Sequence, residues 1–556
     1  MDSDNRINRI VLALYLSFIL ISQIIADPNL CASYLVIGVI AVTVFSFTVS
    51  RYIIRFVSGL SFKDKPHFDK LTPVKLKVLF YGLPLFILLL YYFAYYPGGF
   101  INDSLSQFYQ YFYGEYSDWH PAFHTLFAFT LPMKLTGGWI GSIVLFQILI
   151  MAAAVGYTLE TIHEYAGKVY VIGCMIYILC NPLLAICVNP WKDTSFAIGT
   201  MLLMTFSLRI FITRGAWLAK PVNSVLFVVC MVFTTLFRHN AILFTVPLLA
   251  ALLFCIPPKR FICLLMACIC LFAVVKGPLY SAAGVERRTG RRQTETMGLP
   301  LNVIGAAVAN TPEVLDQDIL DFAYGIAPPE IWEEHYESGN FNIIKWGTQD
   351  DMDESVDIDY AEDYEPSEII DMMFRAFKAS PYVCSRSLVK LTEGIYTVTD
   401  DHYVLIEPYI DWNYFGIGVP GIGIDNYIGL NKPATYTNML TSFFYGTRLL
   451  VRQFCPHIFL YYGVAILAVI VSICSKLSLR RLKDWKVILF ALPLLAYDFG
   501  TSLLLTGSND SPRYFYCTVL IVPVLLIFFY INNSQARCGT MTEEKKNKKS
   551  GGRNGC

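Results

Sequence analysis

Long apolar stretches alternate with short polar segments along most of this chain. A helix needs about 20 mostly apolar residues to cross the hydrocarbon of a bilayer. Stretches that reach or approach this length lie near residues 9–26, 32–50, 77–96, 138–157, 168–188, 194–212, 222–237, 240–256, 260–278, 457–474, 486–505 and 514–531. The pattern therefore predicts an all-α polytopic membrane protein with about 12 spanning helices. The short runs 222–237 and 240–256 predict a broken or tilted hairpin.

Two regions interrupt the apolar pattern. Residues 97–137 are polar and aromatic, and within them the run 121–136 is apolar but too short to span a bilayer. Pro121 and Pro132 bracket this run, which predicts a helix lying in the membrane interface. The second interruption, residues 280–455, holds 27 of the 43 carboxylates and predicts a large extracytoplasmic segment between the ninth and tenth helices.

Within the second interruption, periodicity predicts helices near 366–379 and 383–396. Pro366 suits a first helical position, and Pro381 separates the two helices. The acidic run 350–359 lacks the glycine and terminal glutamate spacing of an EF-hand loop. It is typical of a solvated acidic loop, with a cation site as the alternative.

Lysine and arginine in the short loops orient the chain, since these residues accumulate on the cytoplasmic side. With a cytoplasmic N-terminus, the inside segments carry 26 Lys and Arg, whereas the short outside loops carry four. We therefore expect a multi-pass protein of the cell membrane with both termini in the cytoplasm. The expected regions are an N-terminal transmembrane region, an extracytoplasmic segment, C-terminal transmembrane helices and a cytoplasmic tail, at residues 1–279, 280–455, 456–531 and 532–556.

Composition supports this class. The chain is 55% hydrophobic and 15% charged, with a mean hydropathy of +0.49, whereas a soluble domain carries roughly 25% charged residues. The formal net charge is zero, which gives no indication of a nucleic-acid partner. Most cysteines lie in apolar runs and indicate core positions rather than a disulfide framework.

Ionisable residues at helix ends on one side of a membrane are candidates for function. The charge-bias topology places on the outer face Asp103, His120, His124, Asp193, Arg238, His239, Asp510 and Arg513. We interpret Asp103 as a catalytic general base, because a carboxylate suits the deprotonation of an acceptor hydroxyl. The alternative is helix capping, with Asn102 or Asp103 at the start of a helix over 104–113.

The other candidates are assigned to substrate binding, and they are His120, His124, Lys192, Asp193, Arg238, His239, Arg513 and Tyr514. A phosphate contact is one interpretation of Lys192, Arg238 and Arg513. The alternatives are an interfacial cap for Asp193, a structural ion pair between Arg238 and Asp193 or Asp103, and snorkelling for Arg513. Packing without metal is favoured for His120 and His124. A divalent cation stays open, and no cofactor is assigned.

In these residues the chain resembles the GT-C superfamily of membrane glycosyltransferases, which includes protein O-mannosyltransferases and aminoarabinose transferases of lipid A. The patterns PGG…D…Q…Q, WHP, WKD, RHN and SPRY resemble an uncharacterised bacterial branch, over about residues 78–531. The resemblance implies a hexosyl or pentosyl transferase that uses a polyprenyl-phosphate sugar donor at the outer face. It assigns the base role to Asp103 and a donor-phosphate role to Arg513.

The chain departs from that family in two features. The paired acidic motif common in the first loop is absent, since Asp103 has Asn102 and Ser104 as neighbours. The large loop is also inserted among the late helices. The expected partners are the lipid-linked donor, membrane lipids and a lipid, glycan or protein acceptor. Two alternatives stay open: a polysaccharide polymerase or ligase, and a transporter or flippase of lipid-linked glycan.

Overall fold

A computed structural model describes residues 3–26, 32–59, 72–286, 293–346, 355–397, 408, 438–454, 462–476, 485–508 and 511–531. Apart from isolated β-bridges, helices are the only regular secondary structure in these ranges. The predicted all-α class is therefore confirmed for the described part of the chain.

Six described helices are long and apolar enough to cross a membrane, by length and composition. They are α1 (Ser3–Ala26), α2 (Ala32–Gly59), α3 (Val74–Ala94), α7 (Gly141–Ala166), α9 (Lys192–Thr213) and α12 (Pro258–Val274) with its continuation through η5 (Val275–Leu279) and α13 (Tyr280–Ala282). This supports a membrane protein. The other predicted spans correspond to α10 (Pro221–Phe237), α11 (Ile242–Leu253), α25 (Tyr462–Lys476), α26 (Trp485–Ser502) and the helix Tyr516–Ile531. The total of about 12 stays a prediction.

The spanning stretch predicted near 168–188 is a bent pair of helices. Helix α8 (Lys168–Leu179) meets the 3-10 helix η2 (Pro182–Val188) at 66°. Asn181 caps η2, since its side-chain oxygen accepts a hydrogen bond from Leu183 N at 2.9 Å. Pro182, the first residue of η2, suits the start of a new helix and not the continuation of the old one. The bend turns η2 toward the loop that precedes Asp103.

The break between α10 and α11 is as predicted. Arg238 has an extended backbone, with φ −143° and ψ 144°, and a short 3-10 turn, η4 (His239–Ala241), follows it. The helical axis is interrupted at this point, so the Arg238 side chain leaves the backbone between two helix ends.

The run 121–136 forms one continuous helical segment of α5 (Ala122–His124), the π-helix η1 (Thr125–Thr130) and α6 (Leu131–Leu135). Pro132 lies at the start of α6 and does not end the run, contrary to the sequence prediction. Phe123 and Phe127 pack edge-on against Phe233 of α10, with ring centroids 4.7 and 5.3 Å away. This packing fixes the segment on the bundle.

A second hydrophobic core lies in the segment after residue 297. It is formed by α15 (Gly298–Asn310), α16 (Gln317–Ile326), α17 (Pro329–His335), α19 (Pro366–Ala379) and α20 (Pro381–Thr392). Trp332 is its largest buried side chain, and the indole nitrogen donates to the Ala323 and Ala327 carbonyls. The first predicted helix, 366–379, is confirmed, with Pro366 in its first turn. The second begins two residues earlier than predicted, because Pro381 starts it.

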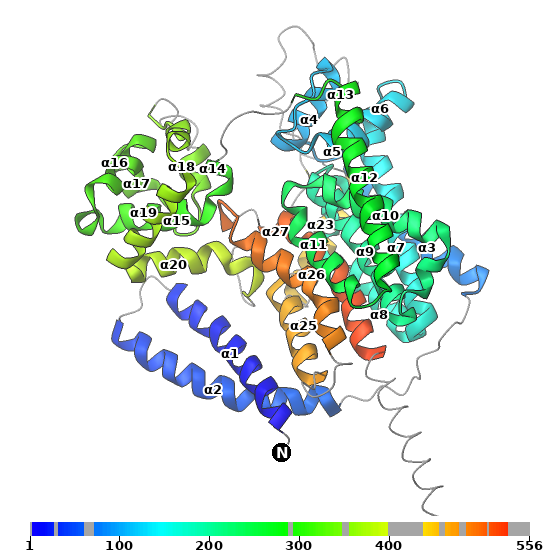
Figure 1. Ribbon diagram of the computed structural model, residues 1–556, viewed down its shortest axis with the longest axis horizontal. Helices are drawn as coiled ribbons and strands as arrows, with labels where there is room; N and C mark the ends of the chain where they lie inside the picture. The colour runs from blue at the N-terminus through cyan, green and yellow to red at the C-terminus, as the bar shows by residue number, and fades with distance from the viewer. Residues whose placement is uncertain are drawn as a thin grey trace, which may run out of the picture.

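Smaller helices complete the described chain: α4 (Asn102–Tyr113), η3 (Ala216–Ala219), α14 (Gln293–Thr296), η6 (Pro312–Val314), α18 (Asn342–Trp346), η7 (Ile358–Asp363), η8 (Glu393–Ile395), α23 (Met439–Phe454) and α27 (Ser511–Tyr514). Figure 1 shows α4, α5, α6 and α13 gathered at one end of the main bundle, while α1 starts at the opposite end. The cluster from α15 to α20 lies beside the bundle, and α20 contacts α1.

Candidate functional site

Gly98 and Gly99 allow the loop before Asp103 to pack closely against η2 and the residue that follows it. Gly99 N donates to the Val188 carbonyl at 3.0 Å, and Gly98 has a φ of 132°. A Cβ on Gly99 would lie 2.0 Å from the Asn189 side-chain oxygen. Only glycine fits so close an approach, and glycine also adopts the positive φ without strain. The glycine pair therefore sets where α4 begins.

Asp103 lies in the first turn of α4 and does not cap it. The N-cap position is Ile101, whose backbone N–H donates to Ser104 Oγ at 2.9 Å, and the Ser104 hydroxyl donates back to the Ile101 carbonyl at 2.9 Å. The capping alternative for Asp103 is therefore wrong, because Ser104 performs that local role. The Asp103 carboxylate therefore makes its hydrogen bonds with residues outside its own helix.

Asp103 joins three segments of the chain. Its Oδ2 accepts from Lys192 Nζ at 3.2 Å and from Arg513 Nη1 at 3.0 Å. Lys192 begins α9, and Arg513 lies in α27, 410 positions after Asp103. Among the described residues, no group donates to Oδ1 of Asp103. The side chains of Asp103, Lys192 and Arg513 are 25%, 17% and 19% exposed, so a ligand can reach all three.

Electrostatics keep Asp103 ionised. Burial raises the pKa of its carboxyl, but Lys192 and Arg513 outweigh this effect and hold that pKa well below its usual range. Burial lowers the pKa of His120 to about 3, so the imidazole is neutral at pH 7. Lys192 Nζ lies 3.1 Å from His120 Nδ1. Because an ammonium group only donates, Nδ1 accepts and Nε2 carries the proton.

His124 is fully buried and uses both ring nitrogens. Nδ1 lies 2.7 Å from Gln107 Oε1, and Nε2 lies 3.0 Å from Ser195 Oγ. An amide oxygen only accepts, so His124 donates through Nδ1 and accepts the Ser195 hydroxyl through Nε2. Burial lowers the pKa of His124 to about 3. This imidazole connects α4 to α9 through its two hydrogen bonds.

These contacts do not fit a metal held jointly by His120 and His124. Both nitrogens of His124 have protein partners, and His120 Nδ1 faces an ammonium group. In the described ranges, no three His, Cys, Asp or Glu side chains gather closely enough to hold a metal ion. Part of the acidic run 350–359 lies outside the described residues. Asp510 also lies outside them.

Arg238 and Asp193 form a second ion pair, which is more buried than Asp103, Lys192 and Arg513. Their side chains are 4% and 0% exposed. Arg238 also donates to Tyr497 OH at 3.2 Å, and its guanidinium lies 4.1 Å from the centre of the Tyr514 ring. This burial favours the structural pair over a phosphate contact for Arg238. Asp193 is not the helix cap either, since Trp191 occupies that position.

Tyr514 connects the buried pair to the reachable site. Its ring faces Arg238 on one side, and the Arg513 guanidinium lies 5.2 Å from the ring centre. The Tyr514 carbonyl accepts from Tyr497 OH at 3.2 Å. The snorkelling alternative for Arg513 is not what the structure shows, because that side chain bonds to Asp103.

His239 and the loop before α5 lie at the edge of the site. His239 Nε2 is 3.3 Å from the Trp119 carbonyl. Lys276 bonds to Asp118 at 2.6 Å, and Tyr280 OH accepts from Phe123 N at 2.8 Å. These bonds connect the segment that carries His120 to η5 and α13.

Sequence reasoning missed several positioning residues: Gln107, Ser195, Tyr497 and Lys276. Gln107 follows Asp103 by four positions in α4, so both side chains lie on one helix face. Ser195 follows Lys192 by three positions in α9 and is its neighbour on that helix. Helical spacing from the candidates was therefore a usable signal for these two residues. Nothing comparable pointed to Tyr497 or Lys276.

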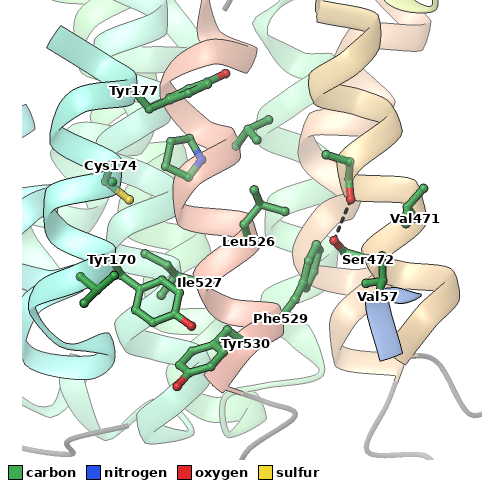
Figure 2. A pocket seen from close by; sticks show the side chains of 15 residues that line it. Val57, Tyr170, Cys174, Tyr177, Val471, Ser472, Leu526, Ile527, Phe529 and Tyr530 are labelled. Atoms are coloured by element: carbon green, nitrogen blue, oxygen red, sulfur yellow. Dashed lines mark hydrogen bonds between the residues drawn. The ribbon is translucent and has the colours of Figure 1, made fainter. Parts of the chain in front are cut away.

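A cavity of about 530 Å³ lies elsewhere in the bundle (Figure 2). Apolar side chains of α8, α25 and the helix Tyr516–Ile531 line most of it, with Tyr170, Tyr177 and Tyr530 supplying hydroxyl groups. The first residue of the helix Tyr516–Ile531 that lines this cavity is Val522. At a rise of about 1.5 Å per residue, Val522 lies well over one helical turn from Arg513. None of the candidate site residues lines this cavity.

No protein-family model matches this chain, and neither a curated protein nor a solved structure shows significant similarity to it.

Proposed function

We propose that this protein is a GT-C-type membrane glycosyltransferase that moves a sugar from a polyprenyl-phosphate donor to a cell-envelope acceptor at the outer face. The observation that carries the proposal is the convergence on Asp103. Two cations from distant segments hold one carboxylate oxygen, and no described group donates to the other. A reachable base beside two cations is the arrangement that this transfer needs.

The cations suit the leaving group. As the bond between the sugar and the phosphate oxygen breaks, negative charge develops on the phosphate, and positioned cations stabilise it. Arg513 offers a planar fork that matches phosphate oxygens, and Lys192 adds a compact positive charge. The phosphate departs as an anion, and no metal is required for this balance.

Asp103 suits the acceptor. As the acceptor oxygen bonds to the anomeric carbon, its hydroxyl proton passes to the carboxylate. Oδ1 is the available oxygen in the described structure, since both cations bond to Oδ2. Attack opposite the departing phosphate inverts the configuration at the sugar. The carboxylate is ionised at neutral pH, so it has no proton of its own that must leave before it accepts one.

The same proposal includes the side of the membrane on which the site lies. Asp103, Lys192 and Arg513 belong to the outer face, with about 12 spanning helices and both termini in the cytoplasm. The excess of Lys and Arg in the opposite loops supports this orientation. The donor lipid then lies in the outer leaflet, with its phosphate at the level of the site.

Transfer from a polyprenyl-phosphate sugar in liposomes tests the proposal. Asp103→Asn keeps the size of the side chain but removes the proton acceptor, so turnover should fall by about 10²–10⁴. The start of α4 should survive, because Ser104 and not Asp103 bonds to Ile101. Glu115→Gln is the matched control, since Glu115 is an exposed carboxylate just after α4. Near-normal turnover by a folded Asp103→Asn protein would remove Asp103 from the mechanism.

A further inference from the structure

Lys192 and Arg513 form a two-cation site that the protein fills with its own carboxylate. They come from different helices, yet both donate to the same atom, Asp103 Oδ2. Sharing one oxygen is a weaker arrangement than the two-pronged contact that an arginine makes with a phosphate or a carboxylate. All three side chains are partly exposed, so an external anion can reach the cations without unfolding the site.

We propose that Asp103 is the internal counter-ion of a phosphate site formed by Lys192 and Arg513, and that an incoming phosphate ester displaces it. The donor then binds before the base is released, and the acceptor reacts second. The identity of the phosphate ester as a lipid-linked donor rests on the proposed function. The competition between Asp103 and a phosphate for the two cations does not.

Displacement also changes the basicity of Asp103. The groups that face its carboxylate are Lys192 from α9, Arg513 from α27 and His120 from the loop before α5, with His239 beyond His120. Lys192 and Arg513 hold the pKa of Asp103 down, whereas burial raises it. A phosphate that neutralises both cations leaves burial as the remaining influence. The carboxylate becomes a better proton acceptor only when the donor is in place.

His120 takes part in the exchange as a positioning residue. Its Nδ1 accepts from the same ammonium group that contacts Asp103. Because burial keeps His120 neutral, it adds no competing positive charge at pH 7. It holds Lys192 at the site while the carboxylate and the phosphate change places.

The test is the affinity of the full-length protein for decaprenyl phosphate in lipid nanodiscs and for inorganic phosphate, measured by calorimetry. If Asp103 competes for the cations, then Asp103→Asn and Asp103→Ser should both bind phosphate more tightly, by on the order of tenfold, because a charge-assisted contact no longer has to be broken. Adding Lys192→Ala to Asp103→Asn should reverse the gain. Glu115→Gln, which removes an exposed charge just after α4, should change nothing.

The outcomes separate the two proposals. Tighter binding of both probes by the Asp103 variants supports the counter-ion site and the lipid donor. Tighter binding of inorganic phosphate alone supports the counter-ion site and removes the lipid donor. Unchanged or weaker binding of both probes by both variants overturns the counter-ion proposal. An equal gain in Glu115→Gln also overturns it, because the effect is then one of net charge.

Discussion

The buried pair of Asp193 and Arg238 gives the sharpest stability prediction. Their side chains are 0% and 4% exposed, so water cannot solvate either charge if the other is removed. Breaking a buried ion pair by removing one partner costs about 3–5 kcal/mol in the free energy of unfolding. We therefore expect Asp193→Asn and Arg238→Met each to lower that free energy by this amount.

Arg238→Met carries additional losses. Its guanidinium lies 4.1 Å from the Tyr514 ring centre and donates to Tyr497 OH. A desolvated cation–π contact contributes about 2 kcal/mol, so this variant should lie at or above the upper end of the range. Asp193→Asn keeps the side-chain size, and its cost should come mainly from the unpaired Arg238 charge.

The double variant decides between a structural and a ligand-binding role. With both charges removed, no uncompensated charge stays in the core, so the cost should be well below the sum of the two single costs. The difference should be at least about 2 kcal/mol, compared with the 0.3–0.5 kcal/mol scatter of independent sites. The assay is denaturant unfolding in mixed lipid–detergent micelles. Additive costs, or a stable Arg238→Met protein that only loses phosphate affinity, would refute the structural interpretation.

Two further predictions concern pH and topology. The folded protein keeps His120 and His124 neutral, with pKa values of about 3, whereas an unfolded histidine titrates near pH 6.5. The unfolded state then binds more protons, so stability should fall as pH drops below about 6.5, by about 2–3 kcal/mol per histidine at pH 4.5. Replacing either residue with glutamine should flatten this decline in thermal melts. For topology, single cysteines in 355–397 should react with an impermeant maleimide applied outside cells, and those in 51–77 should not; the reverse pattern contradicts the orientation.

The sequence predicted which residues gather at the site better than it predicted their contacts. Charge bias placed Asp103, Lys192 and Arg513 on one side of the membrane, although Asp103 and Arg513 are 410 positions apart. Apolar length alone could not reveal the 66° bend at η2. That bend brings the Val188 carbonyl to Gly99 and so fixes the loop before Asp103. Contacts of this kind depend on tertiary packing, which hydropathy does not encode.

The role of Arg238 could not be decided from the sequence alone either. From sequence, an arginine in an apolar region needs a partner, but a phosphate and an aspartate satisfy that need equally well. Burial distinguishes them, because a 4% exposed side chain paired with Asp193 has no room for a ligand. Burial depends on how α9, α26 and α27 pack around the break at residue 238. No local pattern in the sequence reports that packing.

The two ion pairs of the site depend on each other through Tyr514. Arg238 lies over the Tyr514 ring, and the Tyr497 hydroxyl accepts from Arg238 and donates to the Tyr514 carbonyl, so α27 is held from two sides. Arg513 is the preceding residue, and its reach to Asp103 follows from that placement. The buried pair of Arg238 and Asp193 thus supports the partly exposed pair of Arg513 and Asp103, which exchanges partners in the counter-ion proposal. Asp193 and Arg238 therefore serve to position α27, whereas Asp103, Lys192 and Arg513 are the groups to which the proposed function assigns the chemistry.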